Sequence, residues 1–219
     1  MQGAKAVRET LASDYRIITL CATEGFLLET KTTGKVQEVI ETSEKELTTL
    51  GSVDSNSAAL AVVQMKVNGR PHIARDAFAL VLDDIRDPGN LGSIIRSADW
   101  FGITTIVASE ETADFYNPKV INATMGSFLR VSMHYLKLDS FLKSAQVPVF
   151  GTFLDGEDVH TLDFGIGGMV VIGNESRGIS PVVEKSVTRR ITIPRRGHAE
   201  SLNAGVATAV VLDNIRRRS

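Results

Sequence analysis

The sequence predicts an α/β protein in which a parallel β-sheet carries helices on both faces. From Phe78 onward, short apolar segments alternate with segments of helical periodicity, which is the pattern of parallel α/β sheets. The first apolar segment, AFALVLDDI (77–85), is a continuous run of the kind that is buried on both faces of a sheet. Polar loops with glycine follow three of the apolar segments, and open α/β sheets bind ligands beyond the carboxyl ends of their strands.

The composition is that of an ordinary globular protein with room for one large domain or two modest ones. The chain has 219 residues, of which 43% are hydrophobic, and a net charge of −2. This charge excludes a nonspecific polycation but leaves room for a local basic patch. Cys21 is the one cysteine, so no internal disulfide is expected. We find no membrane-spanning run and no signal-peptide pattern, and we expect a cytoplasmic protein.

The first third predicts a small α/β module over residues 1–67. AKAVRETLAS (4–13) has helical spacing, YRIITLCAT (15–23) alternates like a strand, VQEVIETSEKELTTL (36–50) looks helical at both ends, and SAALAVVQMK (57–66) is a short apolar strand. A module of this type usually begins with a strand, so we expect that its first strand is missing here. The polar, aperiodic stretch at 68–77 is expected to be a linker.

The remaining residues, 78–219, predict the larger domain. A helix is expected at 91–101, with Asn90 as its N-cap and Gly102 as its stop. Another helix should begin with Asn117 at the N-cap and Pro118 at the first helical position. The last helix is expected to start at Ser201 as its cap and to end in arginines, where the helix dipole favours cations. Further strands are expected at 104–109, 131–136, 147–154, 167–174 and 189–194.

Three loops at the carboxyl ends of these strands carry the candidate chemistry. They are neither G-x-G-x-x-G nor Walker loops. Each residue in them has an ordinary explanation: a glycine makes a tight turn, Ser201 caps a helix, and a basic pair at 195–196 with another at 189–190 aids solubility. His198 is more often exposed than catalytic in such a loop. Their convergence on one edge nevertheless favours a site; its members are Asn90, Gly92, Arg96, Gly173, Glu175, Arg177, Gly197, Ser201 and Asn203.

These three loops resemble the motifs of the SpoU (TrmH-like) family of RNA ribose 2′-O-methyltransferases, within the SPOUT superfamily. The first family motif, Asn-x-Gly-x-x-x-Arg, is similar to NLGSIIR (90–96), and the second, Gly-x-Glu-x-x-Gly, to GNESRG (173–178). The third, Ile-Pro followed by a glycine loop and Ser-Leu-Asn, is similar to IPRRGHAESLN (193–203). The resemblance covers residues 78–217, and residues 1–67 resemble, more weakly, the L30e-like RNA substrate-binding domain fused upstream.

The resemblance implies a SPOUT-type parallel sheet with a C-terminal trefoil knot, which periodicity alone does not indicate because chains generally avoid knots. It implies S-adenosylmethionine as the cofactor, bound in the knotted region, and no metal. It also implies a homodimer through the catalytic domain, with the final helix supplying Val206, Ala209, Val210 and Ile215 to the interface. The RNA is expected to be ribosomal, while transfer RNA remains an alternative.

The resemblance also implies roles for individual residues. Arg96 is expected to be the essential catalytic residue, either as the base or as a clamp on the RNA phosphate; a guanidinium is rarely deprotonated, which favours the clamp. The other expected catalytic residues are Asn90, Glu175, Ser201 and Asn203. The cofactor is expected to meet Gly173, Ile193, Leu202, Leu154 and Asn203. Phosphate contacts are expected from Arg86, Arg177, Arg195 and Arg196.

Three other functions remain open at this point. The first is an RNA-binding SPOUT-like module without activity, although Asn90 and Arg96 are both present. The second is a nucleotide enzyme with a Rossmann-type sheet that uses His198 as its base. The third is a SPOUT enzyme that methylates a base nitrogen instead of a ribose.

Overall fold

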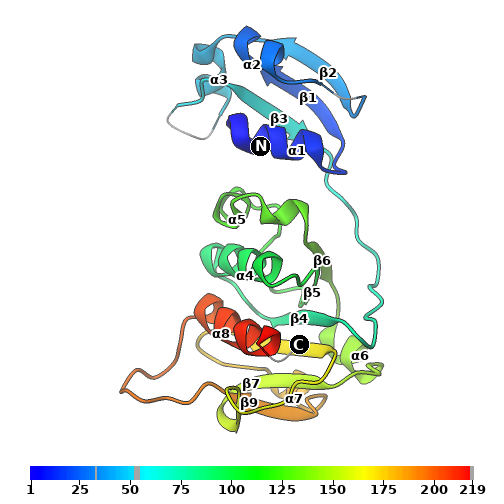
Figure 1. Ribbon diagram of the computed structural model, residues 1–219, viewed down its shortest axis with the longest axis vertical. Helices are drawn as coiled ribbons and strands as arrows, with labels where there is room; N and C mark the ends of the chain where they lie inside the picture. Colours follow the sequence, from blue (N-terminus) through cyan, green and yellow to red (C-terminus); the bar gives the residue numbers. More distant parts are fainter. Residues whose placement is uncertain (33, 52–54, 218–219) are drawn as a thin grey trace. The chain divides into compact units, whose positions relative to one another are not determined.

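The computed structural model describes residues 1–32, 34–51 and 55–217, and the chain divides into two units, Met1–Val67 and Asn68–Ser219 (Figure 1). Each unit has its own sheet. The first unit contains a three-stranded sheet in the order β2-β1-β3, and the second contains a six-stranded sheet in the order β6-β5-β4-β8-β7-β9.

The first unit builds a small core around its central strand. Strand β1 (Ile17–Ala22) pairs in parallel with β2 (Val36–Glu41) and antiparallel with β3 (Ala59–Val63). Helix α1 (Ala4–Ala12) buries Val7 and Leu11 against this sheet, as its apolar spacing predicts. Two shorter helices, α2 (Glu24–Glu29) and α3 (Glu44–Leu50), complete the unit.

The helical prediction for the start of 36–50 is wrong, because Val36–Glu41 is strand β2. Its β-branched residues Val36, Val39 and Ile40 favour extended backbone, and the pairing with β1 fixes it. This strand lies at the edge of the sheet and is mostly exposed, so it lacks the clean in–out alternation that identifies a strand. Only the second half of the segment is helical, and Ser43 and Glu46 form a capping box at its start.

The second unit has the predicted parallel sheet, since every strand pair in its described part is parallel. Its strands are β4 (Phe78–Asp83), β5 (Thr105–Ala108), β6 (Ser132–Tyr135), β7 (Val149–Asp158), β8 (Gly168–Gly173) and β9 (Arg189–Thr192). Numbered within this unit, their order is 3-2-1-5-4-6. The Rossmann order is 3-2-1-4-5-6, so two neighbouring strands are exchanged.

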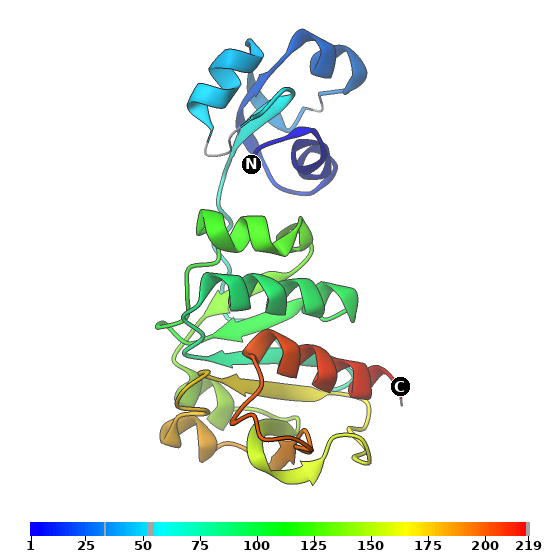
Figure 2. The same cartoon turned by 90° about the vertical axis from the view of Figure 1, so that its left-hand side faces the viewer.

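Helices cover both faces of this sheet. Figure 1 shows α4 (Pro88–Trp100), α5 (Pro118–Thr124) and α8 (Ala204–Arg216) on one side of the sheet and α6 (Leu138–Lys143) on the other. Figure 2 shows α5, α4 and α8 as a layer in which α4 lies in the middle. Strand β4 is buried along its whole length, and its Ala79 and Val81 pack with α6 and α7 (Pro181–Glu184). The continuous apolar run therefore predicted this central strand correctly.

Two predicted helix starts are wrong, each by a few residues. Helix α4 begins at Pro88, and its N-cap is Asp87, whose carboxylate accepts the Asn90 N–H at 2.7 Å. Helix α8 begins at Ala204, and Asn203 caps it by accepting the N–H groups of residues 205 and 206. Asn90 and Ser201 are therefore not N-caps. The cap at Asn117 with Pro118 after it is confirmed.

The helices α2, α6 and α7 were not predicted, because each has only four to six residues and shows too little periodicity to be recognised. Among the described residues, no helix has both the length and the apolar character needed to cross a membrane.

Candidate functional site

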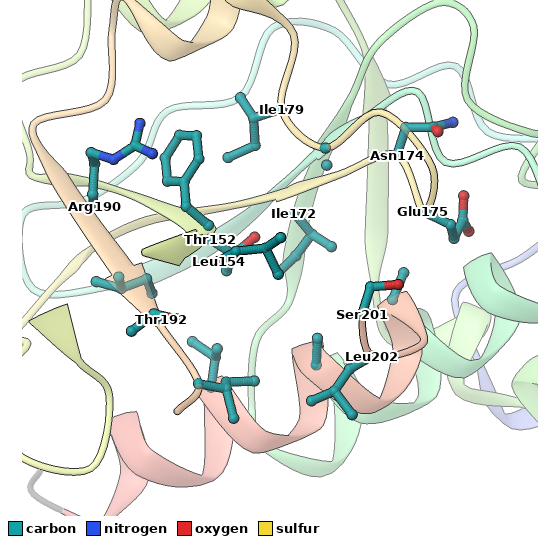
Figure 3. Close-up of a pocket in the computed structure, with 18 of the residues that line it drawn as sticks. Thr152, Leu154, Ile172, Asn174, Glu175, Ile179, Arg190, Thr192, Ser201 and Leu202 are labelled. Carbon is teal, nitrogen blue, oxygen red and sulfur yellow. The ribbon is translucent and has the colours of Figure 1, made fainter. Parts of the chain in front are cut away.

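A pocket of about 840 Å³ lies at the carboxyl ends of β7, β8 and β9 and at the start of α8 (Figure 3). This is the edge at which the three candidate loops were expected to meet. Seven of the predicted site residues line the pocket: Leu154, Gly173, Glu175, Arg177, Ile193, Ser201 and Leu202. Eight others do not line it: Arg86, Asn90, Gly92, Arg96, Arg195, Arg196, Gly197 and Asn203.

Asn90 links the three loops by hydrogen bonds beside the pocket. Its Nδ2 donates to Glu175 Oε1 at 2.7 Å, and its Oδ1 accepts from Asn203 Nδ2 at 2.6 Å. Residues 85 and 113 positions apart in the chain are thereby joined through one side chain. Glu175 and Asn203 are thus linked through Asn90, which lies between them.

The loop after β8 is a tight turn that holds Glu175 and Arg177. Backbone hydrogen bonds join Asn174 and Gly178 in both directions, and the Asn174 Oδ1 accepts the N–H groups of residues 176 and 177. Gly173 must be glycine here, because a Cβ at this position would lie 2.3 Å from the backbone of Gly178. The turn therefore presents Glu175 towards Asn90 with little freedom.

Asn174 and Asp84 fasten this turn to the end of β4, and sequence reasoning missed both. The Asn174 Nδ2 donates to the Asp84 carbonyl oxygen at 2.8 Å. Asp84 has a φ of 62°, in the left-handed region that Asp and Asn tolerate better than most residues. The adjacent buried carboxylate of Asp83 accepts the Ser180 N–H at 2.7 Å. The signal that could have found Asp84 was the pair of acids at the end of the apolar run, immediately before the first candidate loop.

Arg96 is exposed on α4, one turn and a half after Asn90. Within residues 1–32, 34–51 and 55–217 it makes no hydrogen bond and no ion pair. The helix is packed closely one turn earlier, where a Cβ at Gly92 would lie 2.3 Å from the Ala123 side chain in α5. The guanidinium of Arg96 is thus available to a ligand outside the protomer.

The remaining predicted arginines differ in their charge partners. The Arg86 Nε donates to Asp84 Oδ1 at 2.6 Å, and this pairing raises the pKa of Arg86. Arg177 and Arg196 form no ion pair in the described part of the chain, and Arg195 donates only to the Ala199 carbonyl oxygen at 3.4 Å. The loops after β8 and β9 therefore carry arginines that form no ion pair with a carboxylate in the described part of the chain.

The ordinary explanation considered for Arg190 was a basic pair that aids solubility, but this arginine lines the pocket. It forms ion pairs with Asp155 and Glu184, which line the pocket as well. His198 is exposed and does not line the pocket, which removes the basis for its role as a base at this site.

Comparison with known proteins gives one family. Residues 77–213 match the model of the SpoU rRNA methylase family. The 23S rRNA (guanosine(2553)-2′-O)-methyltransferase RlmP of Bacillus subtilis is 33% identical over 141 residues, which are 63% of this chain and 57% of the relative. The 23S rRNA (uridine(2479)-2′-O)-methyltransferase of Streptomyces viridochromogenes is 33% identical over 172 residues, 73% of this chain and 60% of the relative. The chain thus matches less than two thirds of the length of either.

A solved structure extends the similarity to both units. The AdoMet-bound rRNA methyltransferase from Sinorhizobium meliloti superposes with a TM-score of 0.89 at 29% identity, over 99% of this chain and 86% of that one.

Proposed function

This chain belongs to the SpoU rRNA methylase family, and on that premise we propose that it methylates a ribose 2′-hydroxyl of RNA with S-adenosylmethionine. The hydrogen-bond chain from Glu175 through Asn90 to Asn203 is the observation that carries the proposal, because it joins all three motif loops beside one pocket. Both relatives named above are 23S rRNA 2′-O-methyltransferases, which supports ribosomal RNA over transfer RNA as the substrate.

The pocket fits S-adenosylmethionine in size and in charge. Its volume lies within the range of about 300–1,000 Å³ that small-ligand sites occupy. Its lining combines apolar side chains with four carboxylates and two arginines, a balance that suits a cationic sulfonium. Of the expected cofactor residues, Leu154, Gly173, Ile193 and Leu202 line the pocket and are proposed to hold the cofactor, whereas Asn203 does not line it. When bound, the cofactor supplies the methyl group as an electrophile.

We assign Arg96 to the RNA phosphate and to the developing negative charge on the attacking oxygen. A guanidinium stays protonated, so it serves as a donor and a charge and not as a base. The absence of a described partner for Arg96 supports this role, because its donors are free for RNA. Arg177, Arg195 and Arg196 are proposed to hold neighbouring phosphates. Arg86 is proposed as a weaker contact, since Asp84 already compensates its charge.

Asn90 and Glu175 are proposed to hold the loops, and through them the ribose, in the orientation that an in-line methyl transfer requires. Such a displacement depends strongly on orientation, and a side chain that is hydrogen-bonded on both sides is held in place. Asn203 is hydrogen-bonded to Asn90 and also caps α8, so it connects these loops to the start of that helix. Ser201, exposed at the pocket, is proposed to contact the bound ligands.

We propose further that the chain is knotted and dimeric. The strand order, which departs from the Rossmann order at β7 and β8, supports a SPOUT-type sheet with a trefoil knot. Val206 on α8 is 51% exposed and supports a homodimer through this helix, with Ala209 and Val210 beside it. Ile215 is buried in the protomer, so it is excluded from that interface. Size-exclusion chromatography with light scattering should report a dimer for the wild type and a monomer for Val206→Arg.

The first unit is proposed to be the L30e-like RNA-binding domain and the second, from residue 78, the catalytic domain. Residues 1–67 form a core of their own, which supports a separate role. A cytoplasmic location is proposed for the whole chain, as suits a protein with a single cysteine that acts on RNA.

Calorimetric titration with S-adenosylhomocysteine tests the cofactor assignment. We expect micromolar binding to the wild type and its loss in Leu202→Arg, because a bulky cation would fill the pocket beside the start of α8. Val182→Arg is the control, since Val182 is similarly exposed and lies outside the pocket. Equal binding by all three proteins would place the cofactor elsewhere.

A further inference from the structure

Four residues of β7 leave its ladder with β9 and form part of the pocket wall. Thr152 and Glu157 both pair with Ile191 of β9, so Phe153–Gly156, here called the β7 bulge, has no register partner in that strand. Phe153, Leu154 and Asp155 all line the pocket. The Leu154 residue is 80% exposed, so the bulge presents an apolar side chain that the protomer itself does not cover.

Arg190 of β9 holds the β7 bulge from three directions. Its Nη2 donates to Asp155 Oδ1 at 2.7 Å, its Nη1 donates to Glu184 in α7, and its guanidinium carbon lies 3.6 Å from the centroid of the Phe153 ring. An isolated exposed ion pair contributes little, but this single guanidinium is shared by two carboxylates and stacked on a ring. It therefore ties the bulge both to its own strand and to α7.

The backbone of the bulge also rests on Arg190. Gly156 has a φ of 153°, and a Cβ added to it would lie 2.7 Å from the Arg190 carbonyl oxygen. The bulge thus lies directly against the β9 backbone at Arg190, and the side-chain contacts hold the part that the ladder leaves unpaired.

The neighbouring Arg189 makes similar contacts on the other side of the strand. Its Nη2 donates to Glu157 Oε2 at 2.6 Å, and its guanidinium carbon lies 5.8 Å from the centroid of the Phe150 ring. Neither Arg189 nor Glu157 lines the pocket. Adjacent strand residues point to opposite faces, so the two arginines form a matched pair of which only one faces the site.

We propose that Arg190 is a positioning residue for the cofactor, which acts by holding the β7 bulge as a wall of the pocket. This inference rests on the proposed function, because it takes the pocket to be the S-adenosylmethionine site. Figure 3 shows Arg190 on the side of the pocket away from Glu175, so its effect falls on binding and not on the reacting groups. Because the wall is already formed, less conformational entropy is lost when the cofactor binds.

The test compares Arg190→Ala, Arg190→Lys and the control Arg189→Ala, all in the full chain. Titration with S-adenosylhomocysteine should show binding weakened about tenfold or more in Arg190→Ala and nearly unchanged in Arg189→Ala. Arg190→Lys should be intermediate, because lysine keeps the charge but loses the planar stack and the two-sided contact. At saturating cofactor and RNA, the kcat of Arg190→Ala should stay within about twofold of the wild-type value, while KM for the cofactor rises.

Amide hydrogen exchange provides a readout that needs no cofactor. A peptide covering Phe153–Gly156 should exchange faster in Arg190→Ala than in the wild type or Arg189→Ala. Equal exchange in the three proteins, or equal cofactor affinity in the two alanine variants, would overturn the proposal. A wild type that does not bind S-adenosylhomocysteine would refute the proposed function instead, and the exchange measurement would still decide whether Arg190 holds the bulge.

Discussion

Asn90 is the residue on which the arrangement of the three loops depends, because one amide donates to Glu175 and accepts from Asn203. Asn90→Asp replaces the donor with an oxygen that faces Glu175, so we expect a loss of about 1–3 kcal/mol of stability and most of the activity near neutral pH. Asn90→Ala should cost less stability, since it introduces no like charge. Chemical denaturation of both variants at about pH 4.5 and about pH 7.5 provides the measurement.

The stability lost in Asn90→Asp should partly return as the pH falls, because protonation of either carboxyl restores a hydrogen-bond donor. A pH-independent deficit equal to that of Asn90→Ala would contradict the direct contact with Glu175.

Arg96 carries the strongest expectation about chemistry. Arg96→Ala should reduce methyl transfer by about two to four orders of magnitude, the scale found when a group that stabilises developing charge is removed. Stability and S-adenosylhomocysteine binding should be unchanged, since Arg96 is exposed and outside the pocket. Single-turnover rates and thermal melts measure the two effects. Near-normal turnover in this variant would refute its role.

The candidate site was partly predictable from sequence at this scale. The motif loops placed Glu175, Ser201 and Leu202 in one pocket, because the carboxyl ends of parallel strands share an edge. The N-caps were predicted wrongly because several nearby residues are good caps. Asn90 and Ser201 have suitable side chains, but the N-caps of α4 and α8 are Asp87 and Asn203. Arg190 was missed because its contacts come from the bulge of another strand and from Glu184 in α7, which no local pattern reports.

Among the secondary-structure elements, α4 approaches α5 closely at Gly92. Gly92→Ala places a Cβ 2.3 Å from the Ala123 side chain, so we expect a loss of about 1–3 kcal/mol of unfolding free energy. Gly25→Ala is the opposite case, because a Cβ added to Gly25 in α2 would meet no atom within 4 Å, and this variant should gain about 0.5–1 kcal/mol. Urea denaturation compares the two, and equal effects would contradict the close packing of α4 on α5.

Tyr135 at the end of β6 anchors the loop that leads to α5. Its hydroxyl donates to the Ala113 carbonyl oxygen at 2.6 Å and accepts the Phe115 N–H at 2.7 Å. Tyr135→Phe leaves both groups without this partner. Because Tyr135 is 36% exposed, water replaces part of the contact, and we expect a loss of about 0.5–1.5 kcal/mol in unfolding free energy at neutral pH, measured by urea denaturation.

The effect of Tyr135 should depend on pH. Burial raises the pKa of Tyr135 from 10.0 to about 12, so the folded state favours the neutral phenol. Its contribution is complete below the unfolded pKa near 10 and is lost as the pH rises through about 12. The stability difference between the wild type and Tyr135→Phe should therefore narrow over that interval. A constant difference would show that the phenol is not the group that titrates.

Strands that are buried were predicted correctly because burial produces a recognisable apolar sequence pattern, and an exposed strand was not. Strand β4 is buried along its length and was identified from its apolar run. Strand β2 is an exposed edge strand with three acidic or amide residues among six, and it was taken for a helix. What identifies it as a strand is its pairing with β1, a contact that no local pattern reports.

For the whole molecule, alternating strands and helices predicted the parallel sheet but not its strand order. The exchange of β7 and β8 relative to a Rossmann sheet depends on which strands pair, and both orders satisfy the same periodicity. The resemblance of the motif loops to the SpoU family, and not the periodicity, indicated that the sheet departs from the Rossmann type.

Nucleoside mass spectrometry, after incubation with S-adenosylmethionine and unmodified ribosomal or transfer RNA, tests the proposed ribose methylation most directly. We predict one new 2′-O-methylnucleoside in ribosomal RNA, formed by the wild type and by Arg189→Ala but not by Arg96→Ala. A new base-methylated nucleoside, or no methylation of either RNA by a wild type that binds S-adenosylhomocysteine, would contradict the account.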